Sequence, residues 1–214
     1  MPFAKSKRKR PNLDTANDYN ESGGFLIDPK IHYFSDEERI AEVEEISDEL
    51  VNWLPKQFPR TQNLEYAILK SHLIVEHVIL QYIRCHANVV VDTNKSRFSF
   101  SQKLEIAYLM GFGANDPILI PCVELLNKAR NQVAHKFSMD RNIIDELLRI
   151  VSGPDDPWPT ETDRNRISGL RHICKWICGY TAGYMESDVH FQIQNKEIIR
   201  SMEGDYWEKK DSSV

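Results

Sequence analysis

Several features that would point directly to a function are missing from this sequence of 214 residues. It contains no apolar run of about 18 residues, so we expect no membrane-spanning helix, and we expect no secretory signal peptide. It has only 9 glycines, and none of them belongs to a phosphate-binding loop motif. Its 4 cysteines lack the spacing of a disulfide framework. We therefore expect a cytoplasmic protein with reduced thiols and no membrane partner.

An overall excess of positive charge is also missing. The formal net charge is -5 at pH 7, so the whole chain lacks the electrostatic signature of a nucleic-acid-binding protein. Basic residues are instead concentrated near the start, where five of them lie between Lys5 and Arg10. This run could bind phosphate, act as a nuclear-import signal, or simply be solvated. Residues 1–24 lack apolar periodicity, and we predict that they form a disordered basic tail.

Apolar residues recur at helical spacing through most of the remaining sequence. Val189, Phe191 and Ile193 alternate as in a strand, but three residues are too few to predict a sheet. We therefore predict an all-α protein, an antiparallel bundle of about five to six helices. Periodicity, caps and breaker residues place the helices at about 36–54, 62–87, 100–111, 117–137, 142–151 and 164–184.

Changes in composition divide the chain into four parts. After the basic tail, residues 25–59 form an acidic N-terminal helix and a linker that contains two prolines. Residues 60–190 form the main helical domain, and residues 191–214 form a C-terminal extension.

The predicted helix at 62–87 carries two apolar seams. The first contains Leu64, Ile68, Ser71, Val75, Val78 and Tyr82. The second lies about 100° away around the helix and contains Leu69, Leu73, Glu76, Leu80, Ile83 and Ala87. Two seams require two partners, which are provided either by a fully buried central helix or by the protein core together with a second subunit. The carboxylate in the second seam needs a polar partner, such as the histidine one turn before it or an arginine.

The predicted helix at 117–137 combines a core-facing stripe with a polar end. Its apolar stripe faces the core and contains Cys122, Leu126, Ala129 and Val133. Asn131 and His135 lie one turn apart on nearly the opposite side, where we expect solvent or another chain. Arg130 lies to one side, and its long side chain can bring the guanidinium group toward them.

These residues resemble the HEPN superfamily of small all-α domains. The resemblance covers roughly residues 60–185 and rests on a long apolar helix, the segment QKLEIAYLMGF at 102–112 and the segment LLNKARNQVAH at 125–135. The HEPN hallmark is Arg, four to six further residues and then His, commonly with a polar residue directly after the Arg. Arg130, Asn131 and His135 fit this pattern.

The resemblance implies a homodimer that brings two copies of the motif into one cleft. Many members are metal-independent endoribonucleases of toxin–antitoxin or anti-phage systems, whereas others have lost catalysis. We therefore expect a HEPN-like bundle that cleaves RNA without a cofactor, with an antitoxin or regulatory protein as a further possible partner. Toxins paired with a nucleotidyltransferase antitoxin often carry a Tyr two residues after the His, but this position is Phe137, which argues against control by modification at this position.

The same residue types suit RNA cleavage on chemical grounds. A histidine with a pKa near neutral can take the proton from a ribose 2′-OH, and a second histidine from a symmetry-related chain can protonate the leaving 5′-oxygen. The planar fork of Arg130 matches the phosphate oxygens, and Asn131 can orient the imidazole of His135 or donate to the phosphate. The expected products carry a 2′,3′-cyclic phosphate and a 5′-OH.

Other interpretations of the motif remain open. Arg166 and His172 also match the loose pattern, although no Asn follows Arg166. The polar group at 130–135 can also be an exposed helix end whose cations only favour the helix dipole. A third possibility is a non-catalytic regulatory or protein-interaction module, because the layout also resembles the mannitol operon repressor family, which does not preserve the Arg-Asn-x-x-x-His group.

Cysteines and histidines elsewhere in the sequence give weaker indications of a functional site. Cys174 and Cys178 lie one turn apart near His172, but cysteines on a packed helix more often belong to the core than to a zinc site. The histidines at 72, 77 and 86 lack ligand spacing. We therefore predict no metal site.

Overall fold

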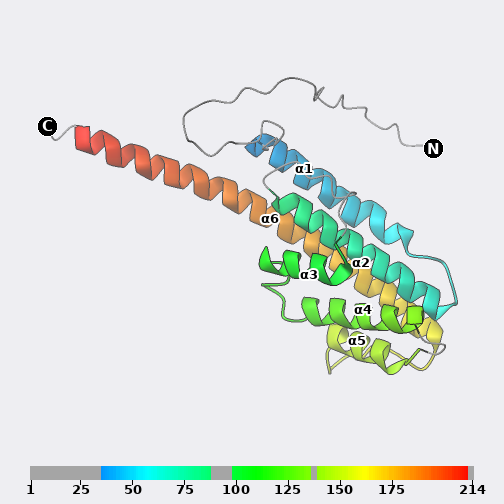
Figure 1. Ribbon diagram of the computed structural model, residues 1–214. Coiled ribbons are helices and arrows are strands. Elements are labelled where there is room, and N and C mark those ends of the chain that lie inside the picture. The colour runs from blue at the N-terminus through cyan, green and yellow to red at the C-terminus, as the bar shows by residue number, and fades with distance from the viewer. Residues whose placement is uncertain (1–34, 88–97, 136–138, 212–214) are drawn as a thin grey trace, which may run out of the picture.

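A computed structural model of the chain describes residues 35–87, 98–135 and 139–211. These residues form six α-helices and two short helical turns, with no strand among them (Figure 1), so the predicted all-α class is confirmed. The predicted basic tail and Phe137 lie outside the described residues. The elements are α1 (Asp36–Asp48), the π-helical turn η1 (Glu49–Trp53), the 3₁₀ turn η2 (Leu54–Gln57), α2 (Leu64–His86), α3 (Phe100–Leu109), α4 (Leu119–His135), α5 (Asn142–Ser152) and α6 (Asp163–Asp211).

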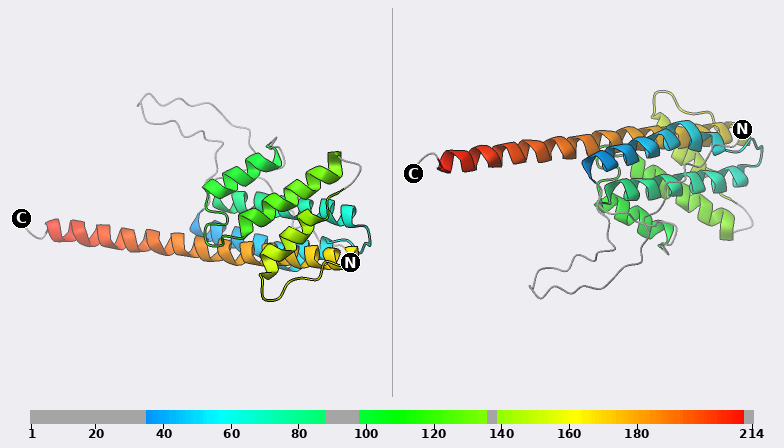
Figure 2. Two further views of the ribbon diagram at one scale, coloured as in Figure 1. Left: turned by 90° about the horizontal axis from the view of Figure 1, so that it is seen from below. Right: turned by 90° about the horizontal axis from the view of Figure 1, so that it is seen from above.

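Helix α2 occupies the centre of the bundle. It packs against α1, α3, α4 and α6, and α5 packs against both α4 and α6 (Figures 1 and 2). The first predicted seam of α2 is buried at every position, from Leu64 to Tyr82. The second seam is only partly covered, and Leu73 is 55% exposed. The core therefore accounts for one seam of α2 and leaves part of the other accessible.

The carboxylate in the second seam has the polar partner that its position requires. Glu76 Oε1 accepts a hydrogen bond of 2.7 Å from Lys103 Nζ on α3. His72 Nδ1 lies 4.0 Å from the other oxygen of the same carboxylate. We expected a histidine or an arginine in this role, and a lysine from the neighbouring helix provides the shorter contact.

The α1 region ends differently from the prediction. Ser35 and Glu38 form a capping box at the start of α1, as the acidic first turn suggests. The α-helix ends at Asp48, and the chain then continues through η1 and η2 rather than as one α-helix to residue 54. Pro55 lies in the 3₁₀ turn, where its missing N–H removes no α-helical hydrogen bond.

Helix α6 is much longer than predicted. We expected a helix to about residue 184, but α6 continues to Asp211 and crosses the predicted domain boundary at residue 191. Val189 and Ile193 are buried one turn apart and Phe191 is exposed, so the strand-like alternation lies on a helix. Two polar contacts join this part of α6 to α1, from Arg39 to Gln192 and from Lys196 to Asp36. Beyond them, the C-terminal part of α6 projects past the other helices (Figures 1 and 2).

Candidate functional site

The candidate site lies on α4, which begins at Leu119 rather than at Pro117 as predicted. Asp116 Oδ1 accepts a hydrogen bond of 3.0 Å from the backbone N–H of Ile118 just before the helix. Pro121 falls in the first helical turn, where a backbone N–H would have no acceptor within the helix. The proline is therefore compatible with the helix that carries the site.

The orientation of α4 agrees with its apolar stripe. Cys122, Leu126 and Ala129 are buried, and Val133 is partly buried against the core. Asn131 and His135 are exposed on the other side of the helix. The prediction that these two polar side chains point away from the core is confirmed.

Arg130 and Asn131 are directly linked. Arg130 Nη1 donates a hydrogen bond of 3.0 Å to Asn131 Oδ1, so the guanidinium group does turn toward the exposed face. Within the described residues, no carboxylate pairs with Arg130, and His135 makes no hydrogen bond to either residue. The guanidinium group therefore keeps most of its donors available for an anion.

A second polar network lies one turn earlier on α4. The buried His72 of α2 donates from Nε2 to Oδ1 of Asn127 over 3.2 Å. Burial lowers the pKa of His72 below its ordinary value of 6.5; the bond to Asn127 and the charge of Glu76 oppose this effect, and the charges of Arg130 and Lys103 add to it. His72 is therefore a neutral imidazole near pH 7, which is consistent with a single donated hydrogen bond.

Sequence reasoning assigned no site role to His72 or Asn127. We considered His72 only as a bundle contact and a partner for Glu76. Asn127 belongs to the segment at 125–135 that carries the resemblance, but helical phase alone does not show which side chain of α2 it meets. The available signal was a polar residue on each of two helices of the predicted bundle, but the sequence did not show that these two helices are neighbours.

The second match to the motif has a structural role. Arg166 forms a bidentate pair with Asp145, with Nε and Nη2 at 2.7 Å and 2.9 Å from the two carboxylate oxygens. It also donates to Asp163 at 3.2 Å. The ring of His172 lies 5.2 Å from the ring of Trp158. Because its donors are directed to carboxylates of α5 and α6, Arg166 is poorly placed to bind a phosphate.

The cysteines do not form a reactive or metal-binding group. Cys174 and Cys178 are buried, and burial raises the pKa of each thiol to about 12. His172 is instead exposed, and its ring lies at a tilt beside that of Trp158. In the part of the chain that the structure describes, no cluster of three or more His, Cys, Asp or Glu residues could hold a metal ion.

The other two histidines of α2, which are partly buried, also have structural partners. His77 Nε2 lies 2.9 Å from Glu49 Oε1 at the end of α1. His86 contacts the backbone carbonyl of Tyr82 through Nδ1 and Asp188 of α6 through Nε2, each at 2.9 Å. These contacts connect helices and leave no free imidazole nitrogen at His86.

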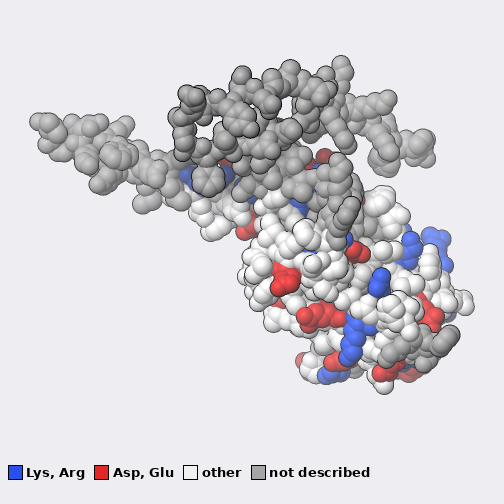
Figure 3. All heavy atoms as spheres, in the orientation of Figure 1, with Lys and Arg blue, Asp and Glu red and all other residues white. Residues whose placement is uncertain are grey.

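Charge is unevenly distributed over the face that carries α3 and α4. Figure 3 shows acidic side chains over α3 and the first part of α4, and Lys and Arg side chains over the middle of α4 and beyond, with further acidic side chains near its C-terminal end. The C-terminal end of α4 is also where Arg130 and His135 lie. The candidate site is therefore at an end of α4 where charges of both signs lie, whereas the charge over α3 and the first part of α4 is acidic.

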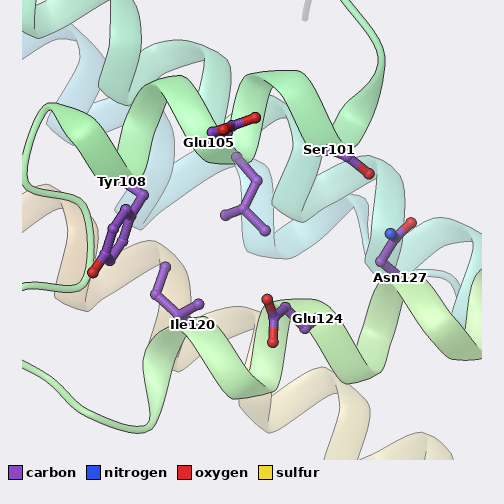
Figure 4. Close-up of a pocket in the computed structure, with 7 residues that line it drawn as sticks. Ser101, Glu105, Tyr108, Ile120, Glu124 and Asn127 are labelled. Atoms are coloured by element: carbon purple, nitrogen blue, oxygen red, sulfur yellow. The ribbon is translucent and has the colours of Figure 1, made fainter.

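A groove of about 610 Å³ separates α3 from α4. Tyr108 and Ile120 lie at one end, and Ser101 and Asn127 lie at the other (Figure 4). Its lining residues are Ser101, Leu104, Glu105, Tyr108, Ile120, Glu124 and Asn127. The lining residues of α4 share one outward face with Asn131 and His135, because successive members of the set 120, 124, 127, 131 and 135 are three or four residues apart. The groove and the candidate site are therefore neighbouring parts of one surface.

Comparisons of this chain with protein-family models, with curated proteins and with solved structures found no match. The resemblance to the HEPN superfamily therefore stays a prediction from the sequence. None of the helices in the described ranges has the length and apolar character needed to cross a membrane.

Proposed function

We propose that this protein is a metal-independent endoribonuclease of HEPN type, with a composite site formed in a homodimer, and that it acts as a toxin or as an anti-phage defence component. One observation carries the proposal. Arg130 has no carboxylate partner among the described residues and bonds to the exposed Asn131, which lies one turn from the exposed His135. Arg166, the alternative match, instead pairs with Asp145.

The proposed reaction assigns a role to each residue. Arg130 binds the scissile phosphate, and its bond to Asn131 limits the positions of the guanidinium group. His135 takes the proton from the ribose 2′-OH while the 2′-oxygen attacks phosphorus. The bond from phosphorus to the 5′-oxygen breaks, and the same histidine of a second copy gives a proton to that oxygen. The products carry a 2′,3′-cyclic phosphate and a 5′-OH, and no cofactor takes part.

An exposed apolar surface near the site supports the homodimer. Leu73 follows His72 on α2, and His72 bonds to Asn127 one turn before Arg130 on α4. Leu73 is 55% exposed, and Tyr66, seven residues earlier and on nearly the same face of α2, is 46% exposed. Large apolar side chains on one helix face are often covered by a partner. A second copy that covers this face of α2 would lie beside the two motifs of the composite site.

The test is incubation of the purified protein with total RNA in EDTA, beside His135→Ala and Arg130→Ala. We expect the wild type to cleave RNA to products with 2′,3′-cyclic phosphate ends and both variants to lose this activity while remaining folded. The matched control is His172→Ala, which removes the exposed histidine of the other motif match and should leave cleavage intact. Absence of cleavage by the wild type over a range of salt and pH, or equal cleavage by wild type and His135→Ala, would contradict the proposal.

A second candidate function is a non-catalytic regulatory or protein-interaction module. The observation that favours it is the groove beside the site, which presents two glutamates and no basic side chain. An acidic groove repels RNA phosphates and suits a cationic protein segment. This candidate predicts that the wild type neither cleaves nor binds RNA but retains a protein partner when Arg130 and His135 are replaced.

A further inference from the structure

The groove between α3 and α4 combines an apolar surface with unpaired negative charge. Leu104, Tyr108 and Ile120 provide its apolar lining, and Tyr108 is 60% exposed. Glu105 and Glu124 line it from opposite helices, and both are exposed (Figure 4). Neither carboxylate has a hydrogen bond or ion pair with another described residue. A ligand for this groove therefore needs a large apolar group next to a cation.

Such a segment exists in the same chain. Phe3 is followed by Lys5, Lys7 and Lys9 at alternate positions, with Arg8 and Arg10 between and after them. In an extended segment, alternate side chains share one face and lie about 6.6 Å apart. We propose that the groove is the docking site for this basic segment, residues 3–10 of the same chain, with the aromatic ring at the apolar end and the lysines at the glutamates.

The spacing of the apolar and acidic positions along the groove agrees with the spacing of alternate side chains in the basic segment. Tyr108 and Glu105 are three residues apart on α3, and Ile120 and Glu124 are four apart on α4, so each pair is separated by about one helical turn, roughly 5.4 Å. This is close to the separation of alternate side chains in an extended segment. The ring of Phe3 can therefore lie between Tyr108 and Ile120 while the next lysine of the segment lies between the two glutamates.

The segment can reach the groove. Between Arg10 and Ser35, where the description of the bundle begins, the chain can extend to about 80 Å. The 23 residues of α2 give the bundle a length of only about 35 Å along this helix. A tether of this kind holds the segment at high effective concentration, so weak contacts are enough for docking.

The exposed acidic side of α1 is the main competing surface. Glu44 and Glu45 are exposed there, and neither lines the groove between α3 and α4. Exposed ion pairs alone contribute little. The apolar lining between α3 and α4 can bind the ring of Phe3 in addition to the lysines, and for this reason we place the segment in this groove rather than on α1. The proposal concerns docking alone and does not rest on ribonuclease activity.

The experiment uses the full chain with two added cysteines, Ser6→Cys in the basic segment and Ser101→Cys at the groove. The native thiols will not interfere, because all four are buried and burial raises the pKa of each to about 12. A short bis-maleimide reagent is expected to join the added cysteines within one chain. We expect the additional pair Glu105→Lys and Glu124→Lys to abolish this cross-link.

The matched control is Glu44→Lys with Glu45→Lys, which changes the charge by the same amount on α1 and should leave the cross-link intact. Circular dichroism checks that each variant remains helical. Three results would overturn the proposal: equal cross-linking with and without the groove glutamates, loss of the cross-link only in the α1 variant, or a cross-link that forms only between two chains. The last result would assign the groove to a second copy.

Discussion

His72 of α2 and Asn127 of α4 are joined by a hydrogen bond of 3.2 Å at the point where the core meets the outward face of α4. The imidazole is buried, whereas the amide also lines the groove. Arg130 follows one turn later on the same helix. His72 thus holds the amide of Asn127 in place, and this amide lies on α4 between the acidic groove and the candidate site.

This bond predicts the effect of Asn127→Leu. The substitution leaves the buried imidazole N–H of His72 without its acceptor, so we expect a loss of about 1–3 kcal/mol in the free energy of unfolding. Urea denaturation of the wild type and the variant measures this loss in the free energy of unfolding. The control is Asn131→Ala, an exposed position on the same helix, for which we expect a change within about 0.5 kcal/mol. Equal losses in both variants would show that the histidine bond has no special role.

The lowered pKa of His72 predicts a pH dependence of stability. At pH values between the lowered pKa and the ordinary value of 6.5, the unfolded chain binds more protons at this residue than the folded chain. The contribution of His72 to stability is therefore largest above 6.5 and falls as the pH decreases through this window. We expect the urea midpoint to fall between about pH 7.5 and about pH 5.

The matched variant for this effect is His72→Gln, whose amide can still donate to Asn127 but does not titrate. We expect its urea midpoint to depend less on pH than that of the wild type. An identical pH dependence in both proteins would assign the effect to other groups.

The exposed face of α2 predicts the behaviour of Leu73→Lys. If a second copy covers this face, a buried lysine will weaken association, and the variant will be monomeric at concentrations at which the wild type is a dimer. Light scattering after size-exclusion chromatography measures the mass. Leu109→Lys is the control, since Leu109 is 79% exposed at the end of α3 and should leave the mass unchanged. A monomeric wild type would remove the basis for the composite site.

Two glycines of α6 predict opposite responses to alanine. A Cβ at Gly169 would overlap Leu148 and lie 2.9 Å from Trp158 Nε1, so Gly169→Ala should destabilise the protein by about 1–3 kcal/mol through overpacking. A Cβ at Gly183 meets nothing within 4 Å, so Gly183→Ala should stabilise it by about 0.4–1 kcal/mol. Thermal denaturation of the two variants and the wild type measures both changes in stability. A neutral Gly169→Ala would mean that α5 and the Trp158 loop move away from α6 at little cost.

Much of the fold followed from the sequence because helical periodicity is local. The repeat of apolar residues and the caps at Ser35 and Ser99 predicted the helices and most of their starts. The phase of the apolar stripe on α4 also placed Asn131 and His135 on the outer surface, since a helix fixes the relative directions of its own side chains. The length of α6 was missed because the helical spacing was followed only to Tyr184 and the residues at 189–193 alternate, whereas α1 supplies partners for Gln192 and Lys196.

The sequence alone therefore determined the helical class, the buried stripes and the outward direction of the candidate residues. Only the tertiary structure decided which polar groups meet. Arg130 and Arg166 fit the same loose pattern, but one is free of carboxylates within the described residues and the other is held by Asp145, 21 residues away along the chain. The bond between His72 and Asn127 and the groove between α3 and α4 were likewise not predictable. Periodicity sets directions about one helix axis, whereas contacts between helices depend on how two axes pack.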